Sequence, residues 1–428
     1  SDYTKWGASQ TGDIVTAPGM WSLDNFGNKL IATISDGSTF EWNSNATGAT
    51  SIRATIVSGA PTATQFTLVS TPDRHLVCFG TETTIGTTST QDDMYIRWSS
   101  QESLTTWTPT ATNTAGTQRL ADGTRIVGAI RGRDAIYIWT DTALFTMRFV
   151  GPPFTFSFQQ VGTNCGLIGQ NAAVEVDGSA YWMSENGFFR YTGQLQSMPC
   201  LVEDYVYDDL AGVPRQHIYA GLNNLFGEVT WFYPGSGATA NSRAVTYNYM
   251  DSSSERPIWT TSSLARSTWV DSAIFGKPHG TEYDEDATSD STVGNTDGVT
   301  TYFEHETGTN QIKAGATSAI VANIQSGDFD LDQKGLAGDG EYMMKIRRVI
   351  PDFLTQTGDA RITLNLKNYP TDAETSSSLG PFTTTTSTTK IDTRARARAI
   401  ALKVDNTGST QHWKLGTFRL DIQPDGRR

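Results

Sequence analysis

The segment "VGTNCGLIGQNAAV" (residues 161–174) contains Cys165, one of three cysteines in the chain. A thiol set between glycines could be presented to a substrate as a nucleophile, but it would need a base, usually a histidine, and a group to orient that base. The five histidines stand in distant segments, and none carries a cysteine-hydrolase signature: His75, His217, His279, His305 and His412. We therefore expect Cys165 to be a small buried structural residue.

The three cysteines are predicted to share that structural role: Cys78, Cys165 and Cys200. They are too few for a disulfide framework in a chain of this size. Residues 161–174 fall where one repeating unit ends and the next begins, so the glycines there are expected to let the chain turn between units: Gly162, Gly166 and Gly169.

Charged clusters offer the remaining candidate sites. Oxygen ligands for a hard cation are present in "EYDEDATSDSTVGNTDG", at Asp284, Asp286, Asp290 and Asp297. The spacing is not that of an EF-hand, so a solvated loop is favoured over a calcium site. Arginines gather in one repeat, at Arg125, Arg131, Arg133 and Arg148. We expect these arginines on a solvated or subunit-contact face.

A second group of arginines, in "DTRARARAIAL", alternates along a predicted strand: Arg394, Arg396 and Arg398. This pattern favours a charged stripe that faces water or an acidic neighbour over a phosphate contact. The chain contains no Gly-rich phosphate loop, zinc spacing or HExxH motif. We predict no catalytic, cofactor-binding or metal-binding residues, no cofactor and no enzyme activity.

Composition points to short strands joined by turns. The chain has 428 residues, of which 18% are charged, with 40 Gly and 11 Trp, a balance that favours strands over long helices. The net charge of −13 argues against a general nucleic-acid-binding role, which would need a basic face. No apolar run approaches the roughly 20 residues of a membrane helix, so no membrane insertion is expected.

Internal repeats organise the first three quarters of the chain. Three segments share a large apolar residue, a Ser or Thr, an acidic residue, a small turn and a Phe: "ISDGSTFEW", "WTDTALFTM" and "MSENGFFRY". Weaker copies appear around Trp98, Trp231 and Phe303, with spacings of about 40 to 50 residues wherever no polar insertion intervenes. Such repeats predict a β-propeller of about six blades over residues 1–312. A pair of β-sandwiches sharing hairpin chemistry is the alternative.

After residue 312 the pattern changes to period-two strands, which predict a β-sheet or sandwich domain over residues 313–428. The strands are expected in "EYMMKIRRVIPDF", "ARITLNLKN", "RARAIALKV" and "WKLGTFRLDI". The Thr/Ser-rich stretch 375–389 is expected to be an exposed excursion. The clearest helix signal in the chain is "VEDYVYDDLAG" (residues 202–212), with Gly212 as its cap.

Long segments resemble a known family, the tail nozzle (tail hub, or packaged-DNA stabilisation) proteins of short-tailed bacteriophages. The resemblance is carried by residues 128–193, by "LVEDYVYDDL", by "IRRVIPDF" and by the ending "RLDIQPDGRR". It implies a virion protein, assembled in the host cytoplasm as a homo-hexameric ring below portal and adaptor. Such a ring carries tail fibres or spikes and conducts double-stranded DNA.

An acidic chain suits that role, because a wall that repels phosphate does not retain sliding DNA. Two other classes of protein stay open. One is a propeller-based carbohydrate- or receptor-binding module. The other is a propeller hydrolase, since "SSQESLTTW" is weakly similar to the Asp-box hairpin of sialidases. A sialidase site would need arginines spread over several blades around a Tyr nucleophile.

Overall fold

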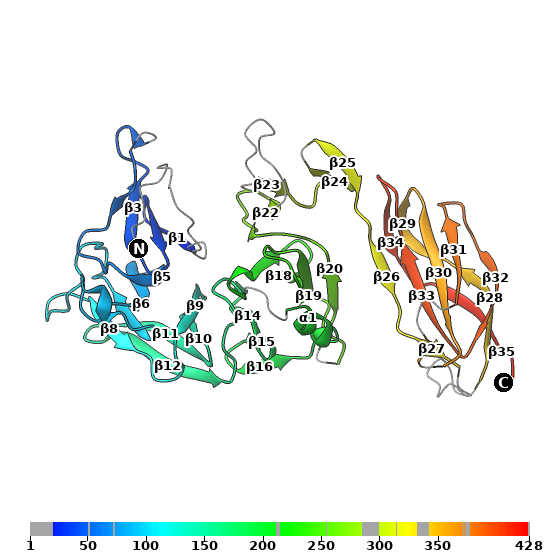
Figure 1. Ribbon diagram of the computed structural model, residues 1–428, viewed down its shortest axis with the longest axis horizontal. Coiled ribbons are helices and arrows are strands. Elements are labelled where there is room, and N and C mark those ends of the chain that lie inside the picture. Colours follow the sequence, from blue (N-terminus) through cyan, green and yellow to red (C-terminus); the bar gives the residue numbers. More distant parts are fainter. Residues whose placement is uncertain are drawn as a thin grey trace. The chain divides into compact units, whose positions relative to one another are not determined.

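The protein is all-β (Figure 1). The computed structural model describes residues 20–49, 52–71, 73–210, 215–253, 255–284, 299–313, 315–331, 342–369, 371–372 and 377–426. Within them the chain forms two compact units, Ser1–His305 and Glu306–Arg428. The division expected after residue 312 falls within β24 (Asn310–Lys313), close to the observed one.

The first unit consists of successive antiparallel sheets, each of which follows chain order without a crossover. The first sheet contains β1 (Trp21–Phe26), β2 (Lys29–Ile34), β3 (Thr39–Asn43) and β4 (Thr55–Ile56). The second contains β5 (Thr64–Ser70), β6 (His75–Thr81), β7 (Tyr95–Trp98) and β8 (Gly116–Arg119). The third contains β9 (Ile126–Arg131), β10 (Ile136–Thr140), β11 (Ala143–Gly151) and β12 (Thr155–Thr163).

Three further sheets complete this unit. The fourth contains β13 (Ala173–Val176), β14 (Ser179–Ser184), β15 (Gly187–Tyr191) and β16 (Leu195–Met198). The fifth contains β17 (Tyr219–Asn223), β18 (Glu228–Tyr233), β19 (Arg243–Asn248) and β20 (Trp259–Ser262). The sixth has three described strands, β21 (Thr268–Val270), β22 (His279–Asp284) and β23 (Val299–Glu304).

The first strands of consecutive sheets lie next to one another. Contacts join β1 to β5, β5 to β9, β9 to β13, β13 to β17 and β17 to β21. Four-stranded meanders whose first strands meet in sequence are the arrangement of propeller blades. The predicted β-propeller architecture is therefore confirmed as a succession of six blades, running from the first sheet to the sixth. A closing contact between the sixth sheet and the first is not among these contacts.

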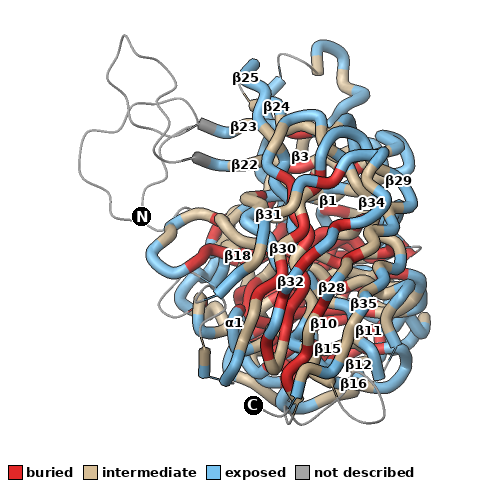
Figure 2. The backbone as a smooth tube through the Cα atoms, turned by 90° about the vertical axis from the view of Figure 1, so that its right-hand side faces the viewer, coloured by how far each residue is buried: buried red, intermediate tan, exposed pale blue. Residues whose placement is uncertain are grey.

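Aromatic residues fill the spaces between blades. Three tryptophans, one on the second strand of each of three consecutive sheets, are fully buried in one core: Trp139, Trp182 and Trp231. Separate cores join the first sheet to the second and the second to the third. Each blade buries its apolar faces only against its neighbours, as expected for stacked repeats. Figure 2 shows the buried residues along the strands and the exposed ones mainly in turns.

The two hairpins that the sequence predicts from short acidic turns between alternating apolar runs are present. Asp141 and Thr142 form the two-residue connection between β10 and β11, and Glu185 and Asn186 form the one between β14 and β15. The repeat alignment was wrong at Trp98. This residue lies on β7, the third strand of its sheet, whereas Trp139 lies on a second strand. A tryptophan suits either strand because both pack against the neighbouring sheet.

The predicted helix exists as α1 (Glu203–Asp209), and its expected cap Gly212 lies outside the described residues. Short 3₁₀ turns occur at η2 (Thr88–Thr90) and η3 (Arg215–His217). In the part of this unit that the structure describes, α1 is the one α-helix, and its buried residue Val206 belongs to the core.

The second unit begins with the hairpin of β24 and β25 (Ala316–Ala319), and its main body is a β-sandwich. One sheet contains β26 (Asn323–Gln325), β27 (Phe329–Asp330), β33 (Ala399–Asp405), β30 (Ala360–Lys367) and β31 (Ser378–Thr384). Another contains β32 (Ile391–Ala397), β28 (Met344–Ile350) and β35 (Arg419–Pro424), and a third pairs β29 (Phe353–Thr357) with β34 (His412–Leu415). Residues of β28 and β32 share one core with residues of β30 and β33.

The Thr/Ser-rich stretch was expected to be an excursion, which is wrong for its central part. Ser378–Thr384 form β31, which pairs in antiparallel register with β30. Threonine is a good strand former because its branched side chain suits a pleated surface. The low-complexity stretch thus contains an edge strand, whose register against β30 shifts between Ile362 and Leu364.

Candidate functional site

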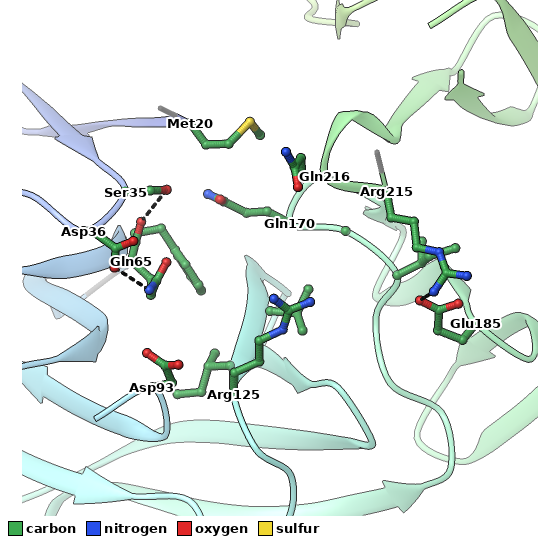
Figure 3. A pocket seen from close by; sticks show the side chains of 15 residues that line it. Met20, Ser35, Asp36, Gln65, Asp93, Arg125, Gln170, Glu185, Arg215 and Gln216 are labelled. Carbon is green, nitrogen blue, oxygen red and sulfur yellow. Dashed lines mark hydrogen bonds and ion pairs between the residues drawn. The ribbon is translucent and has the colours of Figure 1, made fainter. Parts of the chain in front are cut away.

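A polar depression of about 450 Å³ lies where the first strands of five consecutive sheets begin. Met20 precedes β1, Gln65 is the second residue of β5, Arg125 precedes β9, Gln170 precedes β13 and Gln216 precedes β17. The connections between second and third strands contribute three acidic residues, Asp36, Asp93 and Glu185, which Figure 3 labels. One site thus collects side chains from segments that are distant in sequence.

Asp36, from the first sheet, is held toward the second sheet. Its carboxylate accepts hydrogen bonds from Gln65 Nε2 at 2.6 Å and Gln91 Nε2 at 3.0 Å. Asp36 has a φ of 60°, in the left-handed region that an aspartate tolerates better than most residues. The backbone turn therefore directs this carboxylate, and the two amides fix its orientation.

Basic groups line the opposite wall. Arg215 forms an ion pair with Glu185. The Arg125 side chain points into the depression near Asp93 in Figure 3, and among the described residues it takes part in no ion pair. The lining thus combines three carboxylates, two guanidinium groups and several amides. Such a mixture can donate and accept hydrogen bonds at the same time.

The potentially reactive side chains of the lining are carboxylates and one serine. The lining contains no cysteine, histidine, lysine or tyrosine, and the hydroxyl of Ser35 donates to the carbonyl oxygen of Gln65 at 3.1 Å. Carboxylates such as those of Asp36, Asp93 and Glu185 act as hydrogen-bond acceptors in binding sites and as nucleophiles in glycosidases. The depression is equipped to bind a polar molecule.

Cys165 lies between β12 and β13, at the predicted joint, and is fully buried. Its backbone N–H donates to the Thr142 carbonyl oxygen at 3.0 Å, and its own carbonyl oxygen accepts from Trp182 Nε1 at 2.9 Å. Burial raises the pKa of its thiol to about 11. This is the reverse of the shift that activates a catalytic cysteine.

The other cysteines have similar surroundings. Burial raises the pKa of Cys78, on β6, to about 12, and that of Cys200, after β16, to about 11. All three thiols are free.

The expected role of the glycines near Cys165 needs correction. None of Gly162, Gly166 and Gly169 has a positive φ; each is a point of close packing. A Cβ on Gly166 would lie 2.0 Å from the carbonyl oxygen of Asp141, and one on Gly169 would lie 2.4 Å from that of Arg215. The missing side chain thus permits close approach of neighbouring backbone, a property that depends on tertiary contacts.

A buried network around His75 was not foreseen from the sequence. Asp73 Oδ2 lies 2.7 Å from His75 Nδ1 and accepts a hydrogen bond of 2.8 Å from Ser70 Oγ. His75 Nε2 lies 3.0 Å from Thr114 Oγ1. This is the order of groups in a catalytic triad. However, His75 is fully buried and none of these residues lines the polar depression, so the network serves to join β5, β6 and the segment before β8.

The remaining histidines are less scattered than the sequence indicated. His279 and His305 both belong to the sixth sheet region, where His305 Nε2 accepts a hydrogen bond of 2.9 Å from Arg266 Nε. His217 Nδ1 lies 2.9 Å from the Thr239 carbonyl oxygen, and His412 is on β34 of the second unit. No group of three or more His, Cys, Asp or Glu side chains in the described part of the chain is arranged to hold a metal.

The arginine cluster in the third sheet separates into different roles. Arg125 lines the depression, and Arg133 and Arg148 are exposed. Arg131 does not simply decorate a surface: its Nη1 lies 3.0 Å from Asp24 Oδ1 and donates to the Val69 carbonyl oxygen at 3.3 Å. This arginine therefore connects the third sheet to the first and second.

Of the acidic loop, only Asp284 belongs to a described strand, β22. Asp286, Asp290 and Asp297 lie outside the described residues. The predicted stripe holds for two of its three arginines: Arg394 and Arg396 are exposed on β32, where buried and exposed residues alternate. Arg398 lies after the end of β32, in the bend before β33. Arg396 Nε donates to Asp425 Oδ2 at 2.5 Å, so part of the stripe meets an acidic neighbour within the same unit.

Among the described residues, no helix has both the length and the apolar character to cross a membrane. No protein family and no curated protein matches the sequence.

Solved structures with some likeness include BamB from Moraxella catarrhalis, with 11% identity and a TM-score of 0.33, covering 67% of this chain and 83% of that one. Apo AztD from Citrobacter koseri has 10% identity and a TM-score of 0.29, covering 57% and 71%. A mutant of AofleA from Arthrobotrys oligospora has 11% identity and a TM-score of 0.33, covering 70% and 84%. Similarity at this level carries no argument about the fold, which rests on the sheet order described above. The chain is thus an all-β protein of propeller-type blades followed by a sandwich.

Proposed function

We propose that this protein is a non-catalytic binding module, in which the depression at the start of the first strands binds a polyhydroxylated ligand such as a carbohydrate. The observation that carries the proposal is the convergence of polar side chains from five sheets on one depression. Sites of this kind commonly form where several elements of a scaffold meet.

Carbohydrate hydroxyls both donate and accept hydrogen bonds, and the lining matches that requirement. Asp36 and Asp93 offer acceptors, Arg125 offers donors, and Gln170 and Gln216 offer both. The three carboxylates and two guanidinium groups of the lining nearly balance in charge, which suits an uncharged ligand.

Preorganisation favours binding as well. Asp36 is already oriented by two amides, and Arg215 by Glu185. Side chains that are ordered before a ligand arrives lose less conformational entropy when it binds.

The test is titration calorimetry with a panel of neutral and acidic oligosaccharides. Arg125→Gln should weaken binding of the best ligand by about tenfold or more, which corresponds to about 1.4 kcal/mol. Arg133→Gln is the matched control, since Arg133 is an exposed arginine of the same sheet that does not line the depression. Absence of binding across the panel, or equal losses in both variants, would refute the proposal.

A second candidate function is that of a tail nozzle of short-tailed bacteriophages. It is supported by the sequence resemblance over residues 128–193 and at the C-terminal end, and by the acidic net charge of −13. In that role the chain would form a six-membered ring with portal and adaptor proteins and would conduct DNA. Negative-stain electron microscopy of the protein with portal and adaptor tests this candidate. Six-fold rings would support it, and particles containing single copies would exclude it.

The three arginines in and just after β32 allow a finer test of the nozzle role. We expect the stripe to face solvent or a neighbouring copy and not the DNA path. Replacing Arg394, Arg396 and Arg398 by Gln should then leave DNA ejection from assembled particles unchanged. A salt-dependent change in ejection rate, in rings that still assemble, would place the stripe against DNA.

A further inference from the structure

Three connections between strands of the fifth and sixth sheets expose large apolar side chains. The turn between β17 and β18 carries Leu225 and Phe226, and Leu225 is 64% exposed. The connection between β21 and β22 carries Phe275 and Ile274, and Ile274 is 90% exposed. Met250, in the connection between β19 and β20, is exposed as well. We call these residues the hairpin patch.

Hydrogen bonds hold the three connections side by side. The backbone N–H of Tyr249, next to Met250, donates to the Gly227 carbonyl oxygen in the β17–β18 turn at 2.8 Å. The same turn is joined to the connection after β21, because the backbone N–H of Asn224 donates to Asp271 Oδ2 at 2.7 Å. The hairpin patch is therefore one surface assembled from three segments of the chain.

The blade fold does not require apolar residues at such turns. The corresponding turn between first and second strands consists of Gly27 and Asn28 in the first sheet and of Asp177 and Gly178 in the fourth. Glycine and short polar residues are the usual choice there, because they suit the backbone of a tight turn. Large apolar side chains that are exposed singly need no explanation, whereas a cluster of them on one surface indicates an interaction site.

Carboxylates border the hairpin patch. Asp251 follows Met250 in the chain, and Asp271 accepts the hydrogen bond from the β17–β18 turn. Burial, with the negative charges of Asp177 and Asp271 nearby, raises the pKa of Tyr249, so Asp177 also lies close to this surface. None of these three carboxylates forms an ion pair with a residue that the structure describes.

The basic residues of the same connections do not offset these carboxylates. Lys277 forms an ion pair with Glu304 at 3.8 Å, and Arg256 has Glu255 beside it in the chain. Among the described residues, the border of the hairpin patch is thus acidic. An acidic border opposes contact with an anionic lipid surface or with the same border on a second copy, and it attracts Lys and Arg side chains.

We propose that the hairpin patch binds a basic amphipathic segment of a partner protein, whose apolar side chains cover the patch and whose Lys or Arg side chains pair with the bordering carboxylates. An apolar centre inside a polar rim is the common anatomy of protein interfaces. In a meander, the connections that carry the patch lie at the opposite end from the start of the first strand, where the depression is. The inference therefore does not depend on the ligand of the depression.

The test is a titration of the full chain into a fluorescein-labelled synthetic peptide that has Leu and Lys at the spacing of an amphipathic helix, followed by fluorescence anisotropy. A second peptide has Glu in place of Lys. We expect the Lys peptide to bind and the Glu peptide not to bind. Phe226→Ser and Ile274→Ser should each weaken binding of the Lys peptide by about tenfold. Asp177→Asn combined with Asp251→Asn should make binding weaker and less dependent on salt.

Phe154→Ser is the matched control, because Phe154 is an exposed phenylalanine of the β11–β12 connection and lies outside the hairpin patch. Its affinity for the Lys peptide should equal that of the unaltered chain, which separates the patch from a general attraction between a cationic peptide and an acidic protein. Equal losses in Phe154→Ser and Phe226→Ser, binding of the Glu peptide, or no binding of the Lys peptide would overturn the proposal.

Two further measurements test the other occupants. Flotation with phosphatidylglycerol vesicles that depends on Phe226 would overturn the proposal and assign the hairpin patch to a membrane surface. Dimers in sedimentation velocity that are lost in Phe226→Ser would overturn it in favour of a second copy of the chain. We expect neither result, because both surfaces would place negative charge against the carboxylates at the border.

Discussion

The carboxylate of Asp24 accepts a hydrogen bond of 2.7 Å from the backbone N–H of Val69, across the junction of the first and second sheets. β5 is the first strand of its sheet, so its free edge has no strand partner to satisfy that N–H. The same carboxylate pairs with Arg131 of the third sheet at 3.0 Å. One half-buried acid thus joins three consecutive blades.

Asp24→Ala should therefore lower the free energy of unfolding by about 1–3 kcal/mol, because it leaves a backbone donor without an acceptor. Asp24→Asn keeps an acceptor oxygen and should cost less. Urea denaturation followed by tryptophan fluorescence measures both variants. Equal losses for the two would assign the effect to the ion pair with Arg131.

Gly166→Ala should destabilise the joint between the third and fourth sheets. Its Cβ would overlap the carbonyl oxygen of Asp141, and overpacking of this kind costs about 1–3 kcal/mol or more. Gly327→Ala serves as the control, because a Cβ there meets nothing within 4 Å. Thermal denaturation should show a clear decrease for the first variant and no more than a small change for the second.

The thiols should be slow to alkylate at pH 8. Burial raises the pKa of Cys78 to about 12 and those of Cys165 and Cys200 to about 11, so little thiolate forms in the folded state. Cys200 should react first, since it is the least buried. Iodoacetamide labelling followed by mass spectrometry gives the order, and rapid labelling of Cys165 would contradict it.

The raised pKa values of the thiols also affect the stability of the fold at alkaline pH. Thiols in the unfolded chain ionise near pH 9.0, whereas the folded state resists ionisation up to the raised values. The contribution of the neutral thiols to the free energy of unfolding is thus complete below pH 9 and is lost as the pH rises toward 12. Cys78→Ser, which does not titrate there, should show a shallower loss of stability in urea denaturation between pH 8 and pH 10.

The sixth sheet should weaken in acid. Burial, with Arg266 and His279 nearby, lowers the pKa of His305 to about 4 from 6.5. As the pH falls from 6.5 to 4, the unfolded chain binds a proton that the folded chain excludes, so the free energy of unfolding decreases. His305→Gln can still accept from Arg266 but does not titrate in this range. A pH series of denaturation curves should be flatter for this variant, and an unchanged slope would exclude His305 as the cause.

Local patterns in the sequence determined much of the architecture. Alternating apolar residues around short acidic turns identified the hairpins at Asp141 and Glu185, and period-two runs identified β28, β30 and β33 of the sandwich. These features depend on neighbouring residues only, because strand alternation and turn geometry are set within a few positions along the chain. The short helix at residues 203–209 was equally visible for that reason.

Only the tertiary structure decided which distant residues meet. The depression takes Asp36, Arg125 and Gln216 from three different sheets, and no spacing along the chain relates them. The close approach at Gly166 and the placement of Arg131 beside Asp24 likewise arise when blades stack. Repeating blades have similar local sequences but different neighbours. The strands and turns within a blade can therefore be predicted from the sequence. Contacts between blades depend on packing between residues far apart in the sequence.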